Sequence, residues 1–345
     1  YIFAFLVVVV GASLLLFALR GPQMASASDY SGWSRETMLL VNNVLLVSST
    51  TMILIGTLYP LLADVLDLGK ISVGPPYFSF FFVPITSLMM LFLGFAGFTR
   101  WKKSDNAMML SRGALPSIVS LTLALLLPAM MAEPLSWQTY SLTAVVTLFL
   151  SLWVITMTME DVLLKSSGSV KKLKALTGSY WGMVLAHSGL AVCVIGVGLS
   201  SAYDMQRDVR MVPGDFVEVA DYEFQFLGVE RVDGPNFIAY RGDIRGASND
   251  QVVTSMHPEK RNYKARDQVM TEAAIDATLW RDLYVSLGEP LAWAIRLQVK
   301  PFVRWIWLGG IMAALGGFSA AFDRRYRRRK RGSQLSLNAG AIALD

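Results

Sequence analysis

Two histidines are the side chains of this 345-residue sequence best suited to chemistry near neutral pH. His187 lies in an apolar stretch from Tyr180 to Tyr203, about seven residues from its start, which in a helix places it roughly 10 Å inside a membrane. An ionisable group at that depth is costly unless it has a partner or a function. Because a neutral imidazole is a common axial ligand of haem iron, His187 is a candidate haem ligand.

The neighbours of His187 leave a second interpretation open. Small residues recur at steps of three and four on a helix face about 100° from the imidazole: Gly182, Ala186, Gly189, Cys193 and Gly196. Such a face admits the close approach of a flat porphyrin or of another helix. In the second case the stripe is ordinary helix packing and His187 hydrogen-bonds a neighbour.

The remaining reactive residues give no further site. His257 precedes Pro258 in a polar stretch, and no second metal ligand follows it at helical spacing, so it is expected to be a solvated turn residue. The lone Cys193 excludes a disulfide within the chain. Phosphate-loop and Cys-x-x-Cys-His motifs are absent, which argues against nucleotide hydrolysis and against a c-type cytochrome. No motif identifies a catalytic residue.

The elements that must position His187 are membrane spans. The sequence is 54% hydrophobic and 17% charged, whereas soluble domains carry about 25% charged residues. Apolar runs long enough to cross a bilayer predict a polytopic α-helical membrane protein with seven spans, at residues 1–19, 39–62, 78–99, 114–132, 137–158, 180–203 and 303–322.

Charge in the short loops predicts the orientation. The first, third and fifth connections contain Lys and Arg clusters, whereas the second and fourth together contribute only Lys70. Positive loops face the cytoplasm, so residues 204–302 are expected outside and the basic tail 323–345 inside. A basic run directly after a span is a topology anchor that touches anionic lipid, so nucleic-acid binding is not expected.

The external stretch 204–302 is predicted to be a small, mainly β domain. Residues 215–230 alternate apolar and polar side chains, which predicts two strands joined by a turn near Ala220 and Asp221. We expect an antiparallel sheet or barrel, with helical periodicity only around Met270–Ala277. Further strands are predicted at 236–240, 251–256, 282–287 and 292–299.

Several ordered segments resemble the CcmF family of cytochrome c maturation proteins. The segments are Trp33–Glu36 with Asn42 and Asn43, Gly56–Pro60, Ser179–Met183 with His187, Arg207–Met211, Glu259–Arg261 with Tyr263, Met270–Asp276, Arg281–Tyr284, and Lys300–Trp307. The resemblance extends from near residue 1 to about Arg325. It implies part of a haem lyase of the bacterial inner membrane, which joins haem to the two thiols of a Cys-x-x-Cys-His apocytochrome c on the periplasmic side.

By this resemblance, His187 matches one axial ligand of a membrane haem b, and haem is also the substrate. The chain starts without Met inside an apolar run, so the opposite axial ligand and the family's tryptophan-rich external loop are expected upstream of residue 1. A membrane scaffold or transporter with an external partner-binding domain is the alternative.

The resemblance also implies partners: apocytochrome c, its presenters of the CcmH and CcmI type, and the haem chaperone CcmE. The external domain is our candidate docking surface because of its side of the membrane and its density of family motifs. The docking candidates are Arg261, Tyr263, Glu272, Arg281, Asp282 and Tyr284.

Overall fold

The computed structural model describes residues 2–24, 33–101, 105–131, 140–249, 251–264, 268–288 and 293–323. Among them, seven helices are long and apolar enough to cross a membrane. They are α1 (Ile2–Met24), α2 (Arg35–Val65), α3 (Pro75–Phe95), α4 (Asn106–Met131), α5 (Leu142–Ser166), α7 (Gly178–Tyr203) and α8 (Val303–Ala321), with a short α6 (Val170–Ala175) before α7. The seven predicted spans are therefore confirmed as helices, while the start of the predicted fifth span and the basic tail from 324 lie outside the described residues.

The helix ends differ from the hydropathy limits because polar first and last turns are satisfied locally. Ser34 accepts a hydrogen bond from the backbone nitrogen of Thr37 at 3.2 Å, which lets α2 begin before its apolar run. The fifth span was predicted to end at 158, but α5 continues to Ser166. Its last turns contain Asp161, which is buried yet paired, so a polar residue there does not end the helix.

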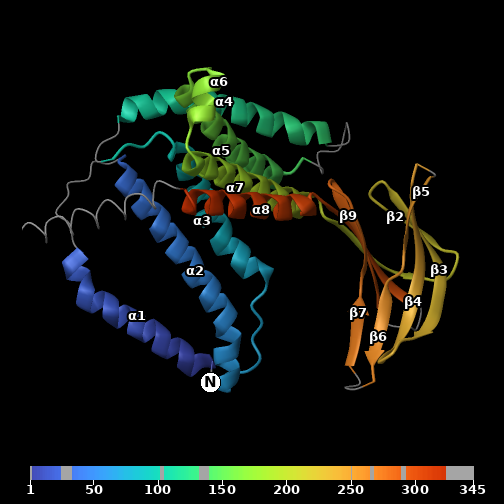
Figure 1. Ribbon diagram of the computed structural model, residues 1–345. Coiled ribbons are helices and arrows are strands. Elements are labelled where there is room, and N and C mark those ends of the chain that lie inside the picture. The colour runs from blue at the N-terminus through green and yellow to red at the C-terminus, as the bar shows by residue number, and fades with distance from the viewer. Residues whose placement is uncertain are drawn as a thin grey trace, which may run out of the picture.

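The helices form a bundle with one splayed side. In Figure 1, α7 and α8 lie side by side near α5, whereas α1 and α2 diverge from that group. The central contact of α3 with α5 depends on Gly94, because the Trp153 ring lies against it and donates to the carbonyl of Leu91 at 3.0 Å. Most other apolar side chains of the spans are exposed, as expected for surfaces that meet lipid.

The small-residue stripe of α7 packs against α8. A methyl group added at Gly189 would lie 2.5 Å from the backbone nitrogen of Ala313, and one added at Gly182 would lie 2.6 Å from the carbonyl oxygen of Gly316. Only glycine permits such close approach of two backbones. Of the two interpretations of the stripe, helix packing is therefore correct, and α8 occupies the face on which a porphyrin was considered.

The stretch after α7 folds into two antiparallel sheets, and Figure 1 shows them at the end of α7 and α8. One sheet has the order β1-β10-β9-β8, and the other has β2-β3-β4-β6-β7 with β5 paired to β4. The strands are β1 (Met205–Met211), β2 (Phe216–Val219), β3 (Tyr222–Asp233), β4 (Phe237–Ser248), β5 (Gln251–Met256), β6 (Glu259–Tyr263), β7 (Gln268–Glu272), β8 (Ala274–Ala277), β9 (Arg281–Leu287) and β10 (Trp293–Pro301).

The core lies between the two sheets, so the domain is a sandwich rather than the single sheet or barrel we expected. Phe224, Phe226 and Ile244 from one sheet pack in one cluster with Leu283 and Leu297 from the other. Each sheet covers the apolar face of the other sheet, so the two inner faces are shielded from water.

The predicted strand pair at 215–230 is confirmed as β2 and β3, joined at Ala220, whose φ is 52°. The helix that the periodicity of Met270–Ala277 suggests does not form. This segment forms β7 and β8, two edge strands in different sheets. Pairing with β6 and β9 overrides the local helical pattern.

The sandwich is joined to the membrane helices through two neighbouring strands. β1 follows α7 directly and β10 leads into α8, and these strands pair with Met205 opposite Val299. Arg304 at the start of α8 donates to the Asp282 carboxylate at 3.2 Å. The helix pair and the sandwich therefore form a continuous structure.

Candidate functional site: a cavity beside His187

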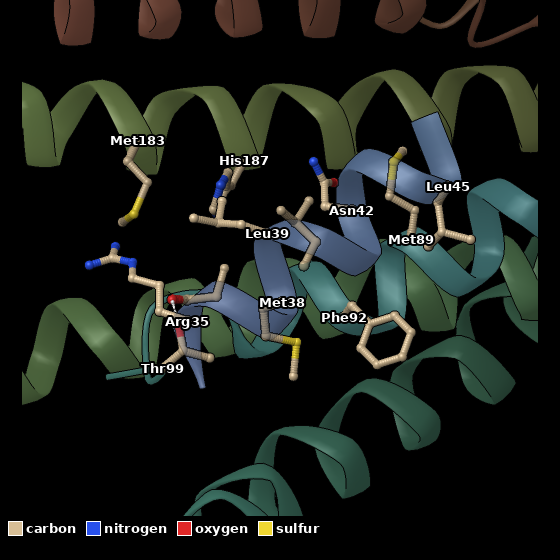
Figure 2. Close-up of a pocket in the computed structure, with 12 residues that line it drawn as sticks. Arg35, Met38, Leu39, Asn42, Leu45, Met89, Phe92, Thr99, Met183 and His187 are labelled. Atoms are coloured by element: carbon tan, nitrogen blue, oxygen red, sulfur yellow. Dashed lines mark hydrogen bonds between the residues drawn. The ribbon is translucent and has the colours of Figure 1, made fainter. Parts of the chain in front are cut away.

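His187 lines a cavity of about 240 Å³ between α7, α2 and α3. Figure 2 shows its ring directed from α7 toward α2, where Leu39 and Asn42 lie. Met183, one turn earlier on α7, lies beside the guanidinium of Arg35. The imidazole thus faces away from the packed α7–α8 contact and into open space.

The lining is apolar apart from a few polar side chains. Leu39, Met89 and Phe92 are among the apolar residues. The polar groups come from Arg35, Asn42, Thr99 and His187. The His187 ring forms no hydrogen bond within the part of the chain that the structure describes, so both ring nitrogens are available there. An apolar cavity with an available imidazole suits a metalloporphyrin.

The size of the cavity bears on how a haem would fit. Its volume is below the roughly 300 Å³ at which typical ligand pockets begin, so it would enclose only part of a porphyrin. Among the described residues the other histidine, His257, lies far along the chain in the sandwich, and no cluster of three or more His, Cys, Asp or Glu forms there. The residues present are of the types that hold one side of a haem: one imidazole for the iron and apolar side chains for the porphyrin face.

Sequence reasoning missed the contribution of α2 to this site. Arg35, Met38, Leu39 and Asn42 all line the cavity and are spaced i, i+3, i+4 and i+7. This spacing places them on one helix face. The periodicity could have identified a common face, but only the fold places that face opposite His187.

A buried carboxylate near the beginning of α7 was also missed. Asp161 of α5 accepts hydrogen bonds from the Lys165 ammonium and from the Tyr180 hydroxyl, both at 2.7 Å. Because the fifth span is predicted to end at residue 158, hydropathy places Asp161 in the connection that follows it. Its charge is balanced by Lys165, which makes the trio a structural feature of the α5–α7 contact.

Three of the docking candidates form one cluster in the six-stranded sheet. The Arg261 guanidinium donates to Glu259 at 2.8 Å and lies 3.6 Å from the Glu272 carboxylate. The same guanidinium lies 4.6 Å from the centre of the Phe237 ring, against which Tyr263 also packs. Arg261, Tyr263 and Glu272 are therefore near neighbours.

The other three candidates lie on β9 in the opposite sheet. Arg281 donates to the Asp276 carboxylate at 2.6 Å and to the Tyr222 hydroxyl at 3.0 Å, which links the two sheets. Asp282 holds the joint to α8, and Tyr284 lines a separate cavity of about 640 Å³ on the sheet. The six candidates thus fall into two groups rather than one surface.

His257 agrees with its predicted setting. Its side chain is 53% exposed between β5 and β6, with Nδ1 3.7 Å from the Asp243 carboxylate. This geometry is that of a solvated turn histidine.

These features define a polytopic helical membrane protein with one β-sandwich domain. Residues 202–301 match the family described as the CcmF C-terminal beta-sandwich. The chain is 46% identical over 332 residues to the cytochrome c-type biogenesis protein CcmF of Pseudomonas aeruginosa, covering 95% of this chain and 50% of that protein. It is 42% identical over 332 residues to CcmF of Escherichia coli (strain K12), again covering 95% and 50%.

A solved structure of a cytochrome c haem lyase CcmF has the same fold, with a TM-score of 0.66 at 20% identity, covering 84% of this chain and 46% of that chain. The chain therefore belongs to the CcmF family. It spans about half the length of the curated relatives it matches.

Proposed function

We propose that this chain is part of a cytochrome c haem lyase, which attaches haem covalently to apocytochrome c during cytochrome c biogenesis. Membership of the CcmF family and the names of its relatives, cytochrome c-type biogenesis protein and cytochrome c haem lyase, support this proposal. The observation that carries it is the available imidazole of His187 in an apolar cavity within the membrane-spanning region.

In this proposal His187 would be one axial ligand of a membrane haem b, and the second ligand would be supplied from outside this chain. Leu39, Met89 and Phe92 would contact the porphyrin face and exclude water. A haem b bound there supplies one-electron redox chemistry, which would keep the substrate haem ferrous. The protein's own task is to hold His187 in the cavity, and the packing of α7 against α8 provides the rigid support.

The reaction itself is an addition that needs positioning more than acid or base strength. Each cysteine thiol adds across a haem vinyl group: a carbon–sulfur bond forms, and the thiol hydrogen moves to the neighbouring carbon. The balance needs no oxidant or reductant once haem and cysteines are reduced. Holding haem and peptide together therefore accounts for much of the rate.

We further propose that the chain lies in the bacterial inner membrane, with residues 204–302 periplasmic and the tail 323–345 cytoplasmic. The charge bias of the short loops supports this orientation. A cysteine introduced at Glu218, which is exposed on β2, should react with a membrane-impermeant maleimide in intact spheroplasts. Protection in spheroplasts with labelling only after lysis would reverse the topology.

The partners proposed for the sandwich are apocytochrome c, CcmH and CcmI-type presenters, and CcmE. The cluster of Arg261, Tyr263 and Glu272 is the better candidate for docking, because the side chains of Arg261 and Glu272 are 30% and 43% exposed. The side chains of Arg281 and Asp282 are only 12% and 11% exposed. Glu272→Ala, at the most exposed charged side chain of this cluster, should reduce recovery of at least one partner in a pull-down from membranes. Unchanged recovery of all of them would remove this cluster from consideration.

The haem proposal is tested on the purified full-length protein. Wild type should show a b-type visible spectrum, which His187→Ala abolishes while the elution volume and Tm stay unchanged. Ser188→Ala, the adjacent position, is the matched control and should keep the spectrum. A colourless wild type would favour the scaffold or transporter, and a retained spectrum in His187→Ala would remove its role as ligand.

A further inference from the structure

The His187 cavity adjoins a second, basic cavity, with which it shares lining residues. The second one has a volume of about 670 Å³ and lies among the ends of α2, α3, α4, α5 and α7. Arg35, Thr99 and Met183 line both cavities. The further cations that line the second cavity are Arg100, Arg112 and Lys165.

Two of these cations have carboxylate partners within the protein. Arg112 lies 3.6 Å from the Glu160 carboxylate, and Lys165 lies 2.7 Å from Asp161. Their charges are therefore largely balanced, and they form the wall of the cavity rather than its binding group.

Arg35 is different, and it lies at the junction of the two cavities. Its side chain is half-buried, and its guanidinium faces the Trp101 ring at 5.4 Å. Within the described residues no carboxylate pairs with it. A partly buried guanidinium without a counter-charge is costly, and its planar fork matches a carboxylate or phosphate in bidentate geometry. An anion in the cavity would therefore meet, in Arg35, a guanidinium that is paired with no carboxylate of the described residues.

The two cavities together specify the shape of the ligand. One chamber is mainly apolar and contains an imidazole, and the adjoining chamber is lined by further cations. Met183 precedes His187 by one helical turn, about 6 Å along the axis, so the basic chamber begins close to the imidazole. A flat apolar body with acidic groups on one edge satisfies both chambers, and haem with its two propionates has this form.

We propose that Arg35 and the basic cavity bind the propionate carboxylates of the haem whose iron His187 holds. This inference rests on the proposed function and adds the orientation of the porphyrin: its acidic edge points toward the first turns of α7. The shared chemistry is a bidentate oxyanion, which a phospholipid phosphate could also supply.

The experiment compares two porphyrins that differ only in these carboxylates. The haem-free full-length protein in phosphatidylcholine nanodiscs is titrated with iron protoporphyrin IX and with its dimethyl ester, and Kd is read from the b-type absorbance. Wild type should bind the free acid at least tenfold more tightly than the ester. Arg35→Gln should lose that preference by weakening only the free acid, and Arg35→Lys should retain part of it.

The control is Arg207→Gln, an exposed arginine of β1, which should leave both affinities unchanged. Equal binding of acid and ester by wild type, or equal weakening of both in Arg35→Gln, would overturn the inference but not the haem proposal. Absence of any b-type spectrum would overturn both. If phosphatidylglycerol raises the Tm of wild type but not of Arg35→Gln and no porphyrin preference exists, the cavity holds a lipid phosphate and the inference is wrong.

Discussion

The two faces of α7 differ in how they pack: one is in close backbone contact with α8, and the other lines a cavity. Toward α8, backbone meets backbone at Gly182 and Gly189, with no space for a single added methyl group. Toward α2, the same helix presents His187 and Met183 to a cavity. Helices in lipid gain little from apolar burial, so close backbone packing has to supply the rigidity. The packed face, at Gly182 and Gly189, therefore fixes the position of the helix. The open face, at Met183 and His187, lines the cavity and can carry a polar side chain such as the imidazole.

The largest effect is expected on the packed face. Gly309→Leu would drive its side chain into the backbone of Cys193 and separate α8 from α7, which costs about 3 kcal/mol or more. Gly310→Leu is the matched control, because an added Cβ there meets no atom within 4 Å. Size-exclusion recovery and Tm in detergent should collapse for the first variant and stay near wild type for the second. Equal behaviour of the two variants would mean that the α7–α8 contact does not carry stability.

A smaller effect is expected where the packed pair enters the sandwich. Asp282→Ala removes the acceptor of the Arg304 guanidinium, and a hydrogen bond of this charged kind contributes about 2 kcal/mol. Tm should fall and proteolysis between β9 and α8 should become faster. Asp233→Ala is the control, because its pair with Arg231 is exposed and contributes little. If Asp282→Ala is cleaved no faster than wild type, strand pairing alone fixes the connection between the sandwich and α8.

The sandwich should also respond to acid. Burial by itself would raise the pKa of the Glu259 carboxyl, but hydrogen bonds from Arg241 and Arg261 and their charges hold it below its ordinary value of 4.5. A carboxyl with a lowered pKa stabilises the fold fully above the ordinary value, and this contribution disappears as pH falls through the folded-state pKa. Glu259→Gln should therefore lower stability by about 1 kcal/mol at pH 7 and by less near pH 4.

Thermal scans of wild type and Glu259→Gln across this range measure the difference. Glu218→Gln, an exposed carboxylate on β2, should show no such convergence. A difference between wild type and Glu259→Gln that grows as pH falls has the wrong sign and would refute the assignment.

The smallest effect on stability is expected on the open face. Leu39 lines the cavity and is already 49% exposed, so Leu39→Ala should change stability by less than about 0.5 kcal/mol. Its haem affinity should nevertheless fall severalfold, because Leu39 would contact the porphyrin. Leu40→Ala, with Leu40 62% exposed and outside the cavity lining, should change neither quantity. Identical haem affinities for the two variants would show that the porphyrin does not contact α2 at Leu39.

Hydropathy predicted the spans because lipid imposes long apolar runs, and it failed at α5, where Asp161 is tolerated through its pairing with Lys165. Alternation predicted β2 and β3, whose faces differ in polarity. It could not identify β1, which is mostly exposed, or β7 and β8, which are held by pairing with their neighbours. These strands depend on tertiary contacts that no local pattern encodes.

The same division applies to the site. His187 could be selected from the sequence because an ionisable residue in an apolar helix is rare. Arg35, Leu39 and Asn42 could not, since their role depends on where α2 lies relative to α7. The docking candidates were chosen by motif density, and their separation onto two sheets follows from strand order.

The central claim is that the open face of α7 binds haem iron through the ring of His187. The most direct measurement is chemical rescue of His187→Gly in the full-length protein, because the glycine leaves space for a free ligand at the same position. Added imidazole should restore the low-spin b-type spectrum of wild type in a saturable manner. A spectrum that is already complete without imidazole, or one that imidazole at saturating concentration does not restore in a folded protein, would contradict the account.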